Sequence, residues 1–128
     1  MRLLLDTHTL LWFISNDPQL SSDAKGQIEH LDNIKYVSVV SLWEIAVKVS
    51  INKLTLPKPF EESFPQQLEE NGFELLPVAF PHLYKILTLP FHHRDPFDRL
   101  LVAQAMVENM TLVTRDTNIP KYPVNTLW

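Results

Sequence analysis

The chain has 128 residues, of which 45% are hydrophobic, and a formal net charge of −4. This length suits one domain, residues 1–128, with a buried core. The absence of cysteine excludes disulfides, thiolate zinc sites and a cysteine nucleophile. Two distant glycines, Gly26 and Gly72, exclude Walker A loops, dinucleotide-binding loops and nucleophile elbows. No apolar run is long enough to span a membrane, so we expect a soluble, cytoplasmic protein.

The chain opens with Arg2-Leu3-Leu4-Leu5-Asp6. Three consecutive leucines leave no polar face, which is typical of a strand buried on both sides in a parallel sheet. Asp6 closes this strand and precedes an apolar helical run, Leu10–Ile14, that stops near Asn16-Asp17-Pro18. In open α/β sheets, ligands bind where strands end and the next helices begin. We therefore expect Asp6 at a functional edge of the sheet.

Strand and helix patterns alternate along the remaining chain. The further strands that we predict are Tyr36–Val40, Glu74–Val78, Thr111–Thr114 and Val124–Leu127. The further helices that we predict are Ser21–Leu31, Ser41–Val49, Phe60–Glu70, Pro81–Leu87 and a helix from Pro96 to about Val107, capped by Asp95. This alternation predicts an α/β fold of three layers, α/β/α, with a mostly parallel central sheet.

Four acids lie at comparable positions in this pattern. Asp6 ends the first strand, and Glu44 lies in the first turn of the helix that follows the second. Asp98 lies in the first turn of the helix capped by Asp95, and Asp116 comes just after a later strand. A parallel sheet brings all four to one edge. Four carboxylates in one cleft repel each other unless cations separate them.

Hard divalent cations fit such a cluster. Mg²⁺ and Mn²⁺ prefer oxygen ligands and commonly join protein carboxylates to substrate phosphates. A site of this kind activates water and stabilises the leaving oxygen of a phosphodiester, which is nuclease chemistry. The negative net charge argues against indiscriminate coating of nucleic acid, but it is compatible with a nuclease whose acids hold cations.

Each acid also has a structural role open to it. Asp6 suits a helix cap, and Ser41 with Glu44 matches a capping box. Asp98 at the third helical position gains from the helix dipole, and Asp116 is a common turn residue. The functional interpretation therefore depends on the four acids as a set.

Several other residues are weaker candidates. Arg94, Arg99 and Arg115 are close in sequence to the acids, where an arginine holds phosphate or balances charge, and we favour phosphate for Arg99. Three aromatic residues have side chains that can stack on bases, but we expect packing roles for them: Trp12, Trp43 and Phe97. We expect His8 to be a partly buried residue at a helix start, and the pair His92-His93 to be exposed in a polar loop.

These residues resemble the PIN-domain ribonucleases and, within them, the VapC-type toxins of prokaryotic toxin–antitoxin pairs. The landmarks that carry the resemblance are Leu4-Leu5-Asp6-Thr7-His8, Ser41-Leu42-Trp43-Glu44-Ile45, Asp95 to Ala105, Leu112-Val113-Thr114-Arg115-Asp116 and Tyr122 to Trp128. No single landmark is specific, but their ordered set covers essentially the whole chain.

The resemblance implies a Mg²⁺- or Mn²⁺-dependent endoribonuclease that forms a homodimer and is neutralised by a small antitoxin protein. Its acidic triad corresponds to Asp6, Glu44 and Asp98, and its more variable fourth acid to Asp116. Thr114 corresponds to a hydroxyl often found at the site. Many relatives have Asn where Asp116 stands and place their acid slightly later.

Two alternatives remain open from the sequence. A metal-dependent DNA nuclease or phosphatase would use the same carboxylates. A non-catalytic PIN-like interaction module would use them only as helix caps and would not be stabilised by divalent ions.

Overall fold

The computed structural model describes residues 1–128 and has a five-stranded, wholly parallel sheet. The strands are β1 (Arg2–Leu5), β2 (Ile34–Ser38), β3 (Glu74–Leu76), β4 (Thr111–Val113) and β5 (Thr126–Leu127). Their order across the sheet is β3-β2-β1-β4-β5. The sheet grows outward from both sides of β1, so the strand order reverses between β1 and β4. That reversal is where open α/β sheets bind ligands.

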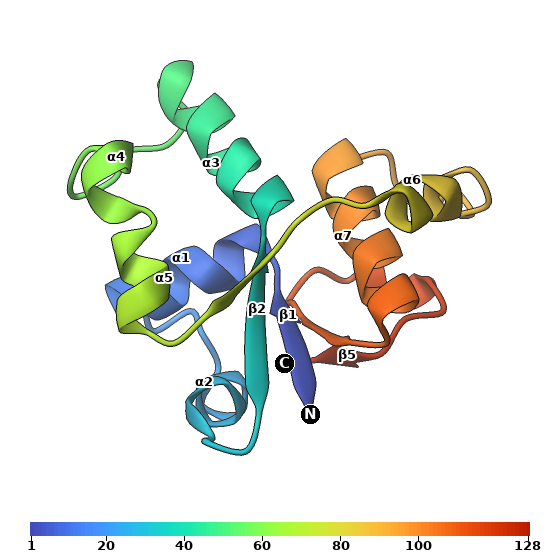
Figure 1. Ribbon diagram of the computed structural model, residues 1–128, viewed down its shortest axis with the longest axis horizontal. Coiled ribbons are helices and arrows are strands. Elements are labelled where there is room, and N and C mark those ends of the chain that lie inside the picture. Colours follow the sequence, from blue (N-terminus) through green and yellow to red (C-terminus); the bar gives the residue numbers. More distant parts are fainter.

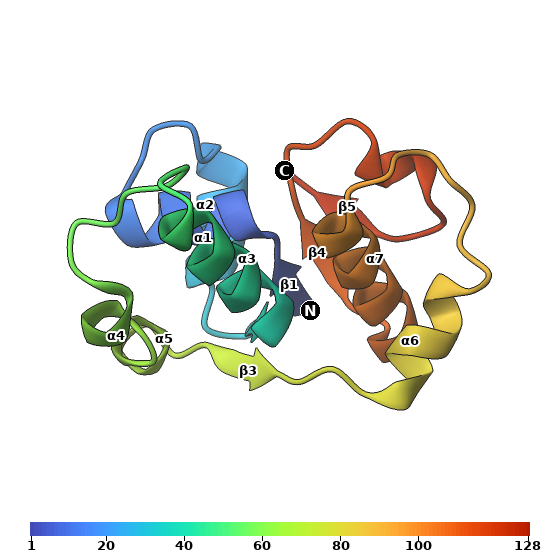
Figure 2. The same cartoon turned by 90° about the horizontal axis from the view of Figure 1, so that it is seen from above.

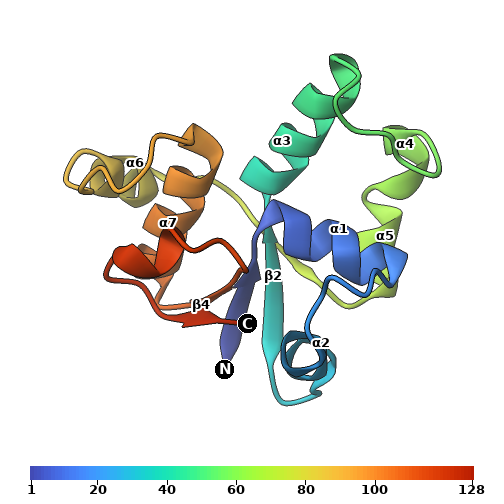
Figure 3. The ribbon, with the colours of Figure 1, turned by 180° about the vertical axis from the view of Figure 1, so that it is seen from behind.

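Helices cover both faces of the sheet, which confirms the predicted three-layer α/β/α architecture. Their bounds are α1 (Thr7–Ser15), α2 (Ser22–Glu29), α3 (Val39–Ser50), α4 (Phe60–Ser63), α5 (Gln66–Glu70), α6 (Phe80–Ile86) and α7 (Pro96–Glu108), and a 3₁₀ turn covers Ile119–Lys121. In Figures 1 and 3, α1, α2 and α5 lie on one side of the strands and α6 and α7 on the other. The chain crosses between the two sides along β3 (Figure 2).

The leucines of β1 divide between two cores. Leu3 and Leu5 pack with residues of α1, α2, α3 and α5, whereas Leu4 packs with α7 and the Ile119–Tyr122 segment. All three are fully buried, as expected for a central parallel strand whose side chains alternate between two covered faces. None of the helices combines the length and the hydropathy that a membrane span requires.

Several predicted element bounds were wrong, for local reasons. The second strand ends at Ser38 rather than Val40, because the Ser38 side chain accepts the backbone N–H of Val40 and caps α3. The predicted helix Phe60–Glu70 is two short helices, since Pro65 has no N–H to donate and Phe64 is extended. The strand that begins at Glu74 ends at Leu76, directly before Pro77.

Other bounds differ only in length. The first helix is longer than Leu10–Ile14 and begins directly after Asp6, whereas the second ends at Glu29 rather than Leu31. The last strand comprises Thr126–Leu127, two residues fewer than predicted.

A buried amide joins the two helices that flank the carboxyl edge of the sheet. Gln104 of α7 is fully buried. Its Oε1 accepts the Ser38 hydroxyl at 2.5 Å, and its Nε2 donates to the Pro77 carbonyl at 3.2 Å. One side chain of α7 thus contacts both the cap of α3 and the residue after β3.

Shortening a β1 leucine should be costly. Leu4→Ala removes a fully buried side chain, and we expect it to lower the free energy of unfolding by about 3 kcal/mol. Urea denaturation measures the loss. Leu31→Ala is the matched control, because Leu31 is 98% exposed and its change should cost under about 0.5 kcal/mol. Equal losses in the two variants would contradict the assignment of β1 to the core.

Candidate active site

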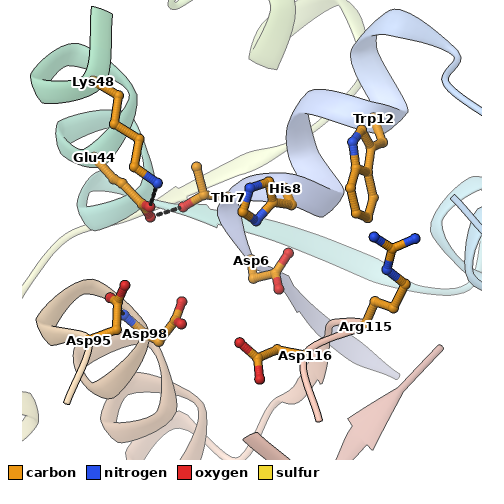
Figure 4. Close-up of a pocket in the computed structure, with 10 residues that line it drawn as sticks. All are labelled: Asp6, Thr7, His8, Trp12, Glu44, Lys48, Asp95, Asp98, Arg115 and Asp116. Carbon is orange, nitrogen blue, oxygen red and sulfur yellow. Dashed lines mark hydrogen bonds and ion pairs between the residues drawn. The ribbon is translucent and has the colours of Figure 1, made fainter. Parts of the chain in front are cut away.

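An open pocket of about 310 Å³ lies at the carboxyl edge of β1 and β4. Its lining is dominated by charged and polar side chains: Asp6, Thr7, His8, Trp12, Glu44, Lys48, Asp95, Asp98, Arg115 and Asp116 (Figure 4). The structure therefore brings together all four acids singled out from the sequence, and it adds Asp95 as a fifth.

Asp6 both caps a helix and faces the pocket. Its Oδ1 accepts the backbone N–H of Thr9 at 2.8 Å at the start of α1, while its own backbone N–H donates to the Val113 carbonyl at the end of β4. The cap uses one carboxylate oxygen. Asp6 therefore does cap a helix, as its position in the sequence suggests, and its second carboxylate oxygen has no hydrogen bond to the protein.

Glu44 is held from two sides. The Thr7 hydroxyl donates to Oε1 at 2.6 Å, and Lys48 Nζ lies 2.6 Å from Oε2. The capping box with Ser41 is not formed, because Ser38 caps α3 and places Glu44 in its second turn. The buried Ser41 hydroxyl has no hydrogen-bond partner. Glu44 is 4% exposed, so Lys48 balances a charge that water barely reaches.

Asp95 and Asp98 share the first turn of α7. Asp95 accepts the backbone N–H of Asp98 at 2.9 Å, which is the predicted cap. Burial, followed by the negative charges of Asp95, Asp6, Glu44 and Asp116, raises the pKa of Asp98 from its ordinary 3.8 to about 7. The raised pKa measures how strongly this pocket disfavours another negative charge.

Asp116 is set by a tight turn after β4. Its backbone N–H donates to the Thr114 hydroxyl at 3.0 Å, and its Oδ1 accepts the N–H of Asn118 at 2.7 Å. Thr114 is 4% exposed and does not line the pocket. Its hydroxyl accepts the backbone N–H of Asp116, so Thr114 supports the turn that carries this acid and does not itself face the pocket.

Arg99, expected from the sequence to bind phosphate, lies outside the pocket. It is 6% exposed and absent from the pocket lining. Its guanidinium donates to the carbonyl of Pro90 and to the Tyr122 hydroxyl, and it lies 4.0 Å from the ring centroid of Phe91. These contacts occupy the side chain in the core under the loop before α7. Arg94 is exposed and also lies outside the pocket lining.

Two cations do line the pocket. Arg115 lies 4.6 Å from the Trp12 ring centroid, and Trp12 in turn lies 5.5 Å from the His8 ring. Sequence reasoning noted Arg115 but overlooked Lys48, although its position four residues after Glu44 on one helix is a recognised ion-pair spacing. His8 is exposed rather than partly buried. Figure 4 shows Arg115 beside Trp12 and Lys48 beside Glu44.

The donor set fits a hard divalent cation. It consists of carboxylate oxygens, with neither thiolate nor imidazole nitrogen required. Burial, and after it the charges of the neighbouring acids, raises the pKa of Asp98, and a bound cation would oppose both effects. As the side chains lie, no three of them converge closely enough to hold an ion. The pocket supplies oxygen ligands and charge, and Lys48 is the cation in direct contact with one of its acids.

The pKa of Asp98 gives the metal-free protein a specific pH dependence. The unfolded carboxyl titrates near 3.8 and the folded one near 7, so between these values the folded state binds the extra proton. The free energy of unfolding should therefore fall as pH rises from about 4 to about 7, by a few kcal/mol. Asp98→Asn should lack this slope and be the more stable form at about pH 8. Urea denaturation of both proteins in EDTA at several pH values tests this. If the free energy of unfolding depends on pH in the same way in the unchanged protein and in Asp98→Asn, the prediction is wrong.

Removing Lys48 should leave Glu44 as a buried charge without its partner. We expect Lys48→Met to lower the free energy of unfolding in EDTA by about 1–3 kcal/mol, since Lys48 itself is partly exposed. Mg²⁺ should restore part of the loss. Lys53→Met, at an exposed lysine outside the pocket, is the control and should leave stability unchanged. A loss in both variants would mean that the Glu44 contact is not the cause.

Comparison with known proteins identifies the family. The PIN domain family model matches residues 3–125. The chain is 30% identical to ribonuclease VapC22 of Mycobacterium tuberculosis, over 91% of this chain and 88% of that protein.

Two solved structures share the fold. The structure of VapBC2 from Rickettsia felis bound to a promoter DNA fragment matches with a TM-score of 0.76 at 18% identity, over 99% of this chain and 98% of that one. A toxin–antitoxin complex from Klebsiella pneumoniae matches with a TM-score of 0.59 at 13% identity, over 98% and 96%. The resemblance drawn from the sequence is thus confirmed: the chain belongs to the PIN-domain family, in the VapC branch represented by the mycobacterial ribonuclease.

Proposed function

We propose that this protein is a divalent-metal-dependent endoribonuclease that acts as the toxin of a type II toxin–antitoxin pair. One observation carries the proposal: five carboxylates from four separate segments meet in a single open pocket at the switch point of a parallel sheet. The similarity to ribonuclease VapC22 supports RNA as the substrate.

The metal ligands in this proposal are Asp6, Glu44, Asp98 and Asp116. When bound, Mg²⁺ or Mn²⁺ supplies a polarised water and stabilises charge on the phosphodiester. Asp95 keeps its place as the cap of α7 and adds negative charge at the rim. Thr114 holds the turn that presents Asp116.

The remaining residues of the pocket suit a strand of RNA. Lys48 and Arg115 are the cations available to the phosphates. Trp12 and His8 lie on one side of the acids and offer ring faces against which a base can stack. Arg99 is left out of this set, because its contacts lie in the core.

The proposed partner is a small antitoxin protein. The similar structure from Klebsiella pneumoniae is a toxin–antitoxin complex, and that from Rickettsia felis contains VapBC2. A homodimer, implied by the family resemblance, completes the proposal. The place of action is the prokaryotic cytoplasm.

The non-catalytic alternative has one observation in its favour, since Asp6 and Asp95 do cap helices. Caps do not account for Glu44, which caps nothing and is held by Thr7 and Lys48 instead. The DNA nuclease and phosphatase alternatives use the same pocket, and only a comparison of substrates separates them from a ribonuclease.

Replacing a proposed metal ligand should abolish cleavage. We expect Asp6→Asn and Asp98→Asn each to lower the rate of RNA cleavage with Mg²⁺ or Mn²⁺ by at least about 100-fold, because each removes a charged ligand. EDTA should have the same effect on the unchanged protein. The assay follows gel-resolved products from structured and unstructured RNAs, beside single-stranded DNA and a small phosphate ester.

Asp32→Asn is the control for these variants, because Asp32 is an exposed acid outside the pocket. This variant should cleave RNA at the rate of the unchanged protein. Equal cleavage by all variants would refute the proposed site. Preferential cleavage of DNA or of the phosphate ester would favour the alternative enzyme classes.

A further inference from the structure

A chain of hydrogen bonds runs from the core to Asp98 and involves no pocket residue except Asp98 itself. It begins at the buried Arg99, whose Nη1 lies 3.1 Å from the Tyr122 hydroxyl oxygen. It continues from that oxygen to His93 Nδ1 at 2.8 Å, and from His93 Nε2 to Asp98 Oδ2 at 3.4 Å. Tyr122 is 2% exposed and the His93 side chain 12%, so water competes little for these bonds.

The direction of each bond follows from the chemistry of its donor. A guanidinium only donates, so the Tyr122 oxygen accepts from Arg99. The single hydroxyl proton of Tyr122 then has two acceptors within reach, His93 Nδ1 at 2.8 Å and the His93 carbonyl at 3.4 Å. The hydroxyl donates to Nδ1, because 2.8 Å is an ordinary hydrogen-bond length whereas 3.4 Å is long for a bond between a hydroxyl and a carbonyl oxygen. His93 Nδ1 is therefore an acceptor.

The acceptor role of Nδ1 determines which ring nitrogen of His93 carries the proton. A neutral imidazole that accepts at Nδ1 carries its proton on Nε2. That nitrogen faces Asp98 Oδ2, so His93 donates to the carboxylate. One oxygen of Asp98 is then held from behind, as outer hydrogen bonds hold the carboxylates of metal sites.

We propose that His93 is a positioning residue for Asp98, held in its Nε2–H tautomer by Tyr122 and Arg99. This proposal rests on the proposed function only in treating Asp98 as a metal ligand. It also gives Arg99 a role: the residue next to Asp98 in sequence points into the core and fixes the far end of the chain. The sequence suggested phosphate binding for Arg99 and an exposed loop for His93, and the structure joins both to the acid instead.

The tautomer itself is measurable in the full-length protein. Nitrogen-15 NMR of histidine-labelled protein at about pH 8 should show His93 protonated at Nε2 and unprotonated at Nδ1. Tyr122→Phe removes the hydroxyl donor and should change this pattern for His93, with the other histidines unaffected except for the neighbouring His92. A wild-type His93 protonated at Nδ1 would overturn the proposal.

Metal affinity tests the consequence for Asp98. With Mn²⁺ as the probe in titration calorimetry, His93→Phe keeps a planar ring but loses the donor, and we expect about tenfold weaker binding. His93→Gln retains an N–H donor and should recover part of the loss. His92→Phe is the matched control. His92 packs edge-on against Tyr122, with ring centroids 4.8 Å apart, and the ion pair with Asp98 belongs to His93.

These experiments distinguish a failure of the His93 proposal from a failure of the proposed ribonuclease activity. Wild-type affinity in His93→Phe, or equal weakening in His92→Phe, would overturn the role of His93. If His93→Phe fails to fold, the wild-type tautomer and the Tyr122→Phe spectrum decide. A protein with the expected tautomer and the expected Mn²⁺ affinities that cuts no RNA would refute the ribonuclease and leave His93 as the residue that positions Asp98.

Discussion

The repulsion among carboxylates at one edge of the sheet is the constraint on which the rest of this structure depends. Five acids share a pocket of about 310 Å³, and their cost is visible in the pKa of Asp98, raised to about 7 by burial and by its acidic neighbours. Such a cluster persists only if the surrounding fold supplies the opposing free energy. The wholly buried leucines of β1, shared between two cores, are the most direct source of that support.

The fold eases this repulsion by giving most of the acids a partner of their own. Asp6, Asp95 and Asp116 each accept a backbone N–H at a helix start or in a turn. Glu44 has the Lys48 ammonium and the Thr7 hydroxyl. Asp98 has only a long contact to His93, and burial together with its acidic neighbours raises its pKa. Among the acids of the pocket, Asp98 in the first turn of α7 thus has the weakest hydrogen bond to its carboxylate.

The order of strands and helices and the set of acids could be predicted from sequence, because both depend on local signals. Leu3-Leu4-Leu5 before Asp6 marks a buried strand, and Asp95-Pro96 marks a helix start wherever the pattern occurs. Their meeting point follows from the parallel sheet, since the carboxyl ends of its strands share one edge.

Two features of the structure were not predicted from the sequence pattern, one for a local reason and one because its contacts join distant residues. The β-branched pair Val39-Val40 has strand propensity but begins α3, because the Ser38 side chain caps the helix there. The neighbours of Arg99 in sequence suggest a phosphate-binding role, whereas its partners in the structure, Pro90 and Tyr122, come from a loop and from near the end of the chain. No periodicity carries that information.

The buried amide of Gln104 has a consequence for how the pocket responds to its contents. Glu44 and Asp98 stand on α3 and α7, and each lies six positions from a residue of the Ser38–Gln104 hydrogen bond at the base of those helices. A buried hydrogen bond beneath the pocket therefore ties the start of α3 to α7. Because this bond joins the helices that carry Glu44 and Asp98, we expect a cation to be accommodated mainly by rotation of the acidic side chains.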